Sequence, residues 1–108
     1  MNVRLYILQR ATAAIMAPLV LVHVVLIFYA TSRGISAADI LGRTRGSLAW
    51  GLFYGLFVLA VSTHGAIGVR VVASEWTRLT GAQLDVLMWG FGLGLAALGL
   101  RAVAAVVL

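Results

Sequence analysis

Charged side chains are scarce in this sequence, and one reactive residue type is missing altogether. The 108 residues include no cysteine, a single proline (Pro18) and only three acids, Asp39, Glu75 and Asp85. Without cysteine the chain can form no disulfide and can supply no thiolate ligand to an iron–sulfur cluster. Any such cluster used with this chain would therefore lie in another subunit.

Apolar residues fill most of the remaining positions. They make up 63% of the chain, and the mean hydropathy is +1.08, which lies well outside the range of soluble globular domains. The eight basic residues are all arginine and give a net charge of +5. They are scattered around apolar segments and form no basic face interleaved with aromatic residues, which argues against a nucleic-acid partner. The expected partners are the lipid bilayer, carboxylates and anionic cofactor groups.

Three apolar segments, at residues 11–31, 48–72 and 84–108, are each near or above the length of about 20 residues needed to cross a bilayer. Because lipid offers no hydrogen-bond partner to an open backbone, all three are expected to be helices. We therefore predict an all-α fold, with three transmembrane helices in a single transmembrane domain covering residues 1–108. In the polar connection after the first span, Ser36 and Asp39 have the spacing of a capping box and predict a short helical segment.

Small residues repeat at helical spacing within the spans. Gly51 with Gly55, and Gly90 with Gly94, place glycines on one helix face, and such pairs let two helices approach closely. We interpret them as helix-packing positions. Asp85, near the start of the third span, suits the positive end of a helix and needs no further role.

His64 lies inside the second span in an unusual setting. Gly65 and Gly68 follow it and remove side-chain bulk from the helix surface, which leaves room for a wide, flat group. Arg70 lies six residues, or about 9 Å, further towards water, where a guanidinium could meet the carboxylate of a bound ligand. A haem b with His64 as axial ligand fits this pattern. The alternative is a histidine that only makes hydrogen bonds between helices.

His23 lies at a different expected depth. Counted along the helices, His23 is about 20 Å into the first span, whereas His64 is only about 9 Å from the Arg70 end of the second. A difference of roughly 10 Å is too large for both to bind one iron, so each would need a partner histidine from another chain. This predicts a hetero-oligomer with one haem on His64, or with a second haem on His23, for which helix packing is the alternative role.

Two motifs resemble a known family. "LQRAT" at residues 8–12 opens the first span, and "HGAIGVRVVASE" at residues 64–75 closes the second. Together they resemble the cytochrome b membrane-anchor subunit of succinate dehydrogenase and fumarate reductase, respiratory complex II. The family pattern is an arginine and serine or threonine motif in helix one, then H-x-x-x-G-x-R and an acidic residue at the end of helix two. Three helices match the forms in which such a chain is half of a heterodimeric anchor bundle.

The resemblance implies roles for particular residues. His64 would be a haem axial ligand, and His23 would correspond to the ligand of a second haem. Arg10 and Thr12 would lie where the quinone head and a haem propionate meet, and Arg70 would contact the propionates or the iron–sulfur subunit. Tyr6 replaces a quinone-binding serine of many relatives and keeps a hydroxyl group; Gln9 likewise replaces a histidine and keeps a hydrogen-bonding side chain.

The resemblance also implies partners and a reaction. Succinate would be oxidised in a flavoprotein subunit, and electrons would pass through an iron–sulfur subunit to quinone, the membrane substrate, beside this chain and a second anchor subunit. In the reverse direction the same complex would reduce fumarate with electrons from quinone. The flavin and clusters would lie only in those partners, and the membrane would be the bacterial inner membrane or an equivalent. Two alternatives remain: a b-type cytochrome anchor of a different membrane dehydrogenase, and a non-redox membrane protein whose histidines only pack.

Overall fold

Three long helices and one short helix make up the chain. The computed structural model describes residues 2–108 and contains α1 (Val3–Ser32), α2 (Ala37–Thr44), α3 (Leu48–Trp76) and α4 (Gly81–Val107), with no strand in that part. By length and composition, α1, α3 and α4 could each cross a membrane. The predicted all-α fold with three transmembrane helices is confirmed.

The helices extend beyond the apolar segments that predicted them. α1 begins at Val3 because the side chain of Asn2 accepts a hydrogen bond from the N–H of Leu5. α4 begins at Gly81, where Thr80 and Gln83 form a capping box. Hydropathy detects only the part of a helix that lies in hydrocarbon, whereas polar caps satisfy the end groups of a helix that continues into the interface.

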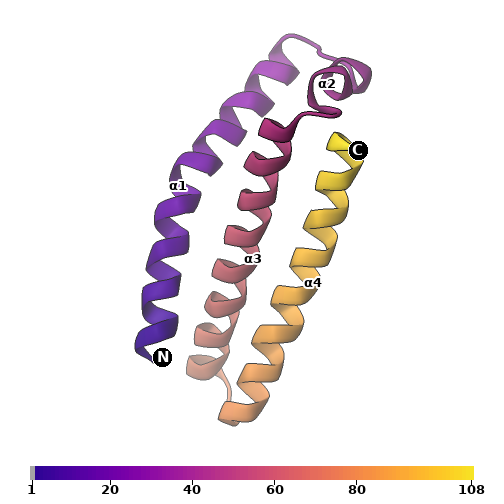
Figure 1. The fold of residues 1–108 in the computed structure, drawn as a ribbon. Coiled ribbons are helices and arrows are strands. Elements are labelled where there is room, and N and C mark those ends of the chain that lie inside the picture. The colour runs from indigo at the N-terminus through magenta and orange to yellow at the C-terminus, as the bar shows by residue number, and fades with distance from the viewer. Residues whose placement is uncertain (1) are drawn as a thin grey trace.

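α3 lies between α1 and α4 and packs against both (Figure 1). The chain runs up α1, down α3 and up α4, so the start of α1 lies at the same end as the α3–α4 connection. α2 lies at the other end, beside the end of α4. The hydroxyl of Thr44 donates to the carbonyl of Val106 at 2.6 Å, and the N–H of Gly46 donates to that of Val107 at 2.8 Å. These bonds hold α2 against the last turn of α4.

The predicted capping box before α2 is confirmed. The hydroxyl of Ser36 accepts from the N–H of Asp39 at 3.2 Å, and the N–H of Ser36 donates to the carboxylate of Asp39 at 3.3 Å. Gly46 follows α2 with a φ of 71°, a left-handed conformation that a glycine adopts without steric cost. It turns the chain directly into α3.

Different glycines from those predicted make the helix contact within this chain. A Cβ built on Gly55, Gly90 or Gly94 would meet nothing within 4 Å. A Cβ on Gly92 would instead lie 2.9 Å from the Cβ of Ala66, and one on Gly99 would lie 2.6 Å from Val58 Cγ1. Of the predicted glycines only Gly51 comes near another helix, since its Cβ would lie 4.0 Å from Val107 Cγ2. For the other three the prediction was wrong within this chain, because spacing shows that two glycines share a face but not which face meets the neighbouring helix.

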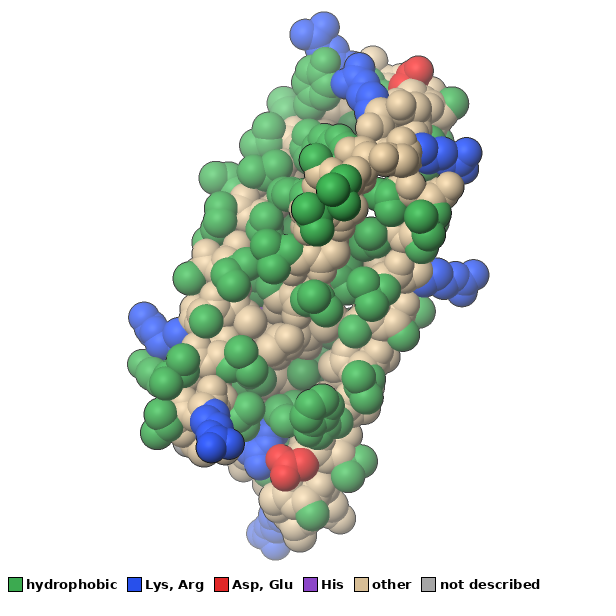
Figure 2. Space-filling view, viewed as in Figure 1, with side chains coloured by type: hydrophobic (Ala, Val, Ile, Leu, Met, Phe, Trp, Pro, Cys, Tyr) green, Lys and Arg blue, Asp and Glu red, His purple; other side chains and the backbone are tan. Residues whose placement is uncertain are grey.

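Within residues 2–108 only a few side chains are buried, and most large apolar side chains along the helices remain exposed. Figure 2 shows apolar side chains over the length of the bundle, with most charged groups gathered towards its two ends. This distribution is the one expected for a protein surrounded by lipid and by other transmembrane helices. The buried residues are Thr12, Thr44, Ala60, Ser62, Ala66, Ile67 and Leu84.

Candidate functional site

A shallow cavity of about 530 Å³ lies beside His64, on the side of α3 next to α1. It extends from His64 to Thr77 at the end of α3, a rise of about 18 Å over the helical part. One end of the cavity is therefore within the transmembrane region and the other is at its edge. The lining residues are Gln9, His64, Gly65, Gly68, Val69, Val72, Ala73, Trp76 and Thr77.

Gly68 keeps one wall of this cavity flat. A Cβ at this position would lie 3.6 Å from Gln9 Nε2, which is an ordinary van der Waals distance. The packing of α1 on α3 therefore does not require a glycine there. Gly65 differs, because its Cβ would point towards α4 and lie 3.4 Å from Leu95 Cδ1.

The imidazole of His64 is positioned by a hydrogen bond with Thr12 of α1. His64 Nδ1 lies 3.2 Å from Thr12 Oγ1, and Thr12 is only 6% exposed. Nε2, the other ring nitrogen, has no hydrogen-bond partner within residues 2–108 and is not among the enclosed polar atoms. The histidine is therefore fixed at one nitrogen and free at the other, at the edge of the cavity.

Gln9 contributes a second unusual polar group to the same cavity. Its Oε1 is buried and has no hydrogen-bond partner among the described residues. Leaving such an atom unpaired costs about 1–3 kcal/mol. A rotation of the Gln9 amide that turns this oxygen into the cavity would let a donor on a bound ligand or on a partner chain remove this cost.

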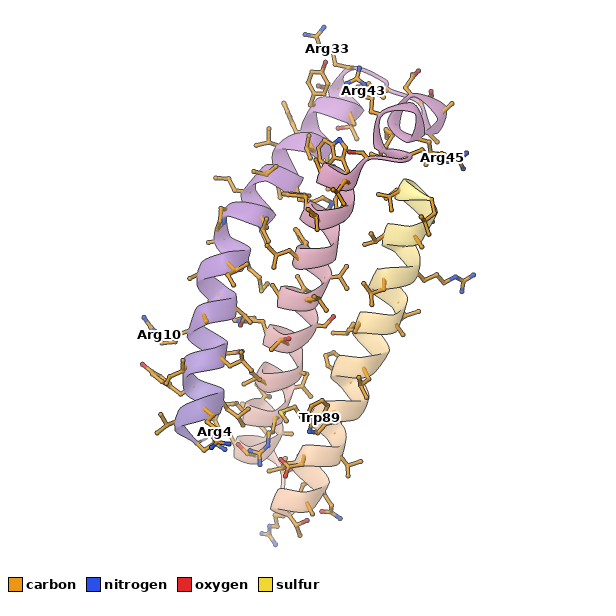
Figure 3. The ribbon with its side chains drawn as sticks, in the orientation of Figure 1. Arg4, Arg10, Arg33, Arg43, Arg45 and Trp89 are labelled. Atoms are coloured by element: carbon orange, nitrogen blue, oxygen red, sulfur yellow. The ribbon has the colours of Figure 1, made fainter. Side chains whose placement is uncertain are left out.

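Tyr6 and Arg10 lie together on a side of α1 other than the one that carries Gln9 and Thr12. Arg10 Cζ is 5.9 Å from the centre of the Tyr6 ring, and Arg10 points away from the bundle (Figure 3). Tyr6 is 52% exposed, whereas Thr12 is buried against α3. The structure thus keeps Tyr6 and Arg10 together and separates Thr12 from them.

Arg70 does not line the cavity. It follows His64 by six residues, which places it about 240° around α3, and its Nε donates to Asp85 Oδ1 of α4 at 2.9 Å. The prediction that Asp85 has no role beyond the helix end is therefore wrong. This ion pair joins α3 to α4 at the end of the bundle where the cavity opens.

His23 lies in a separate environment. Its ring is 5.2 Å from that of Phe57 and 6.1 Å from that of Tyr54, both in edge-on contact. It lines a smaller cavity of about 180 Å³ that also includes Arg43. Because Thr12 contacts His64 and His23 follows Thr12 by eleven residues, the two histidines differ in depth by about 16 Å. This is more than the sequence suggested and again too far for one iron.

Over residues 1–108 the chain matches the family model of the succinate dehydrogenase/fumarate reductase transmembrane subunit. The chain belongs to this family. No curated protein and no solved structure gives a significant match. The family assignment confirms the resemblance found in the sequence. It makes the chain a membrane subunit of complex II, which works in a lipid bilayer together with other subunits.

The donor set of this complex II subunit is compatible with haem. Within residues 2–108 no three histidine, cysteine or acidic side chains come together to hold a bare metal ion. A haem needs only axial ligands from protein, because the macrocycle supplies the others. His64, Gly68 and Gln9 all line one cavity, Nε2 of His64 and Oε1 of Gln9 have no hydrogen-bond partner within residues 2–108, and these residues therefore fit the group.

Sequence reasoning missed the Thr12–His64 contact, the unpaired Gln9 and the Arg70–Asp85 ion pair. The first had a signal in the sequence. Thr12 and His64 are both polar residues inside apolar spans, at similar distances from the same end of the bundle. Two such residues on antiparallel helices are candidates for a direct hydrogen bond.

Proposed function

We propose that this chain is the haem b-binding membrane anchor of a succinate:quinone oxidoreductase, which passes electrons between an iron–sulfur subunit and membrane quinone. The observation that carries the proposal is His64, which is held at Nδ1 and free at Nε2 beside an open cavity. A bound haem supplies a one-electron carrier inside the membrane. The chain itself carries out no succinate chemistry, since the flavin and iron–sulfur clusters belong to partner subunits.

The open side of the cavity supports a haem shared between chains. His64 offers one axial nitrogen, and His23 is too far away to offer the second. A histidine of a second anchor subunit would complete the iron coordination, and the surface of that subunit would close the cavity. The cavity extends to Trp76 and Thr77 at the end of α3, so polar groups of a ligand could reach the interface.

Tyr6 and Arg10 are proposed quinone-site or haem-propionate residues. Their exposure on α1 supports contacts outside this chain, and a phenol and a guanidinium suit a quinone oxygen or a carboxylate. Thr12 was predicted with them, but its hydroxyl already contacts His64. For Arg70, whose side chain pairs with Asp85 at the end of the bundle, docking of the iron–sulfur subunit is the better supported of its two predicted roles.

A second haem on His23 remains a proposal of its own. It is supported by the cavity that His23 shares with Arg43, since an arginine there could pair with a propionate. T-shaped contacts with Tyr54 and Phe57 support the packing alternative. Haem quantification decides between these two roles: two haems per complex would support His23 as a ligand, and one haem would leave His23 as a helix-packing residue.

The experiment that tests the main proposal is a reduced-minus-oxidised spectrum, with haem quantification, of the complex purified with its native partners. We expect b-type haem in the wild type and its loss in His64→Ala. Full haem content in His64→Ala would show that His64 is not a haem ligand. A wild-type complex without haem would support the alternative of a non-redox protein whose histidines only pack. Haem without succinate activity would indicate the anchor of a different dehydrogenase.

A further inference from the structure

The buried hydroxyl of Thr12 is surrounded by three hydrogen-bonding atoms. Thr12 Oγ1 lies 2.9 Å from the carbonyl oxygen of Leu8, 3.0 Å from that of Gln9 and 3.2 Å from His64 Nδ1. A hydroxyl has one hydrogen to donate and two lone pairs that accept. Since the carbonyl oxygens can only accept, the direction of the bond to His64 follows from where the single hydrogen goes.

Only one arrangement makes all three contacts attractive. If the hydroxyl donates to the carbonyl groups of its own helix, a lone pair remains for His64, and Nδ1 must carry a proton and donate. If the hydroxyl donated to Nδ1 instead, two carbonyl oxygens would face its lone pairs at about 3 Å in a buried site, where such repulsion is poorly screened. The geometry therefore selects the tautomer of His64 with its proton on Nδ1 and its lone pair on Nε2.

From this geometry we infer that Thr12 is a positioning residue: by accepting the Nδ1–H of His64, it fixes the tautomer and ring orientation that present Nε2 to the haem iron. The inference rests on the proposed haem site and assigns Thr12 a role different from the quinone or propionate contact predicted from sequence. A hydrogen bond at the remote nitrogen of a histidine ligand increases its basicity, and loss of such partners typically weakens metal binding by about 10–100-fold.

Thr12→Val tests this role in the complex purified with its native partners. Valine keeps the branched shape of threonine and removes only the hydroxyl. The oxidised iron gains more from a strongly donating imidazole than the reduced iron does, so we expect the haem midpoint potential to rise. A selective tenfold weakening of oxidised haem binding corresponds to about 59 mV for a one-electron couple. The electron paramagnetic resonance spectrum of the oxidised haem should also change.

Two further variants separate the role of the hydroxyl from general effects on the helix. Thr12→Ser keeps the hydroxyl and should restore the wild-type potential and spectrum. Thr31→Val on the same helix removes a hydroxyl that, within residues 2–108, bonds only to the carbonyls of Ile27 and Phe28, and it should change neither property. If Thr12→Val fails to assemble, Thr12→Ala removes the same hydroxyl without the added methyl group and carries the same expectation.

The outcomes distinguish this inference from the proposed function. An unchanged potential and spectrum in Thr12→Val, with haem lost in His64→Ala, would overturn the role of Thr12 and leave His64 as ligand. A potential that changes equally in Thr12→Ser would also overturn it. Full haem content in His64→Ala would instead overturn the ligand assignment itself.

Discussion

The contact of α3 with α4 is close and contains small residues, whereas the contact of α3 with α1 contains polar residues and borders an open cavity. At the first, Gly92 and Gly99 let the two helices touch so closely that an added Cβ would lie within 3.0 Å of a neighbouring atom. At the second, Thr12 and Gln9 approach α3 beside His64, and Gly68 has room for a side chain. The α3–α4 contact thus serves the stability of this chain, whereas the α1–α3 contact borders the site that we propose for haem.

Filling the cavity should have the largest effect on function. In Gly68→Leu the added side chain enters the cavity of about 530 Å³ beside His64, so we expect the complex to lose most of its haem. Gly68→Ala should keep most of it, because a Cβ there makes only ordinary contact with Gln9. The measurements are haem content and helix content by circular dichroism. A full complement of haem in Gly68→Leu would show that haem does not use this cavity.

Crowding the α3–α4 contact should instead affect stability. Gly92→Ala places a Cβ 2.9 Å from the Cβ of Ala66, so the two helices must move apart. The matched variant is Gly94→Ala, which has the same gain in helix propensity but meets nothing within 4 Å. We expect Gly92→Ala to be less stable than Gly94→Ala by about 1–3 kcal/mol, measured as the free energy of unfolding in detergent. Equal stabilities would mean that this contact is looser than the structure indicates.

The two contacts also differ in how far the sequence predicts them. Hydropathy located the three spans, and the motif around His64 indicated the face that now borders the cavity. The rotation of α1 about its axis, which brings Thr12 rather than Arg10 against α3, leaves no periodic hydrophobic signal in so uniformly apolar a sequence. The polar pair of Thr12 and His64 is the one indication of this rotation that the sequence carries. The same is true of Gly92, whose neighbours on the helix gave no reason to choose it over Gly90. Helix ends were missed because Asn2 and Thr80 cap them outside the apolar segments.

The Arg70–Asp85 ion pair should contribute little to the α3–α4 contact. The side chain of Arg70 is 18% exposed and that of Asp85 is 56% exposed, and a partly solvated pair of this kind is typically worth less than about 1 kcal/mol. Asp85→Asn should therefore destabilise the isolated chain by less than Gly92→Ala does. The destabilisation caused by Asp85→Asn should also be smaller at high salt than at low salt. Glu75→Gln removes the same charge from the same end without breaking an ion pair within residues 2–108. A loss in Asp85→Asn as large as in Gly92→Ala would contradict this ranking.

The smallest effect is expected at the opposite end of the bundle, in the capping box of α2. Hydrogen bonds from the hydroxyl and the N–H of Ser36 lower the pKa of Asp39 below its ordinary value of 3.8. Because the folded-state pKa is the lower one, this stabilisation of α2 is present above pH 3.8 and is lost as the pH falls through the folded-state pKa. Asp39→Asn should increase amide hydrogen exchange in α2 at neutral pH by less than about tenfold, leaving α3 and α4 unchanged. In Asp39→Asn, amide exchange in α2, corrected for the intrinsic rate, should no longer depend on pH at and below pH 3.8. A pH dependence equal to that of the wild type would show that another group titrates.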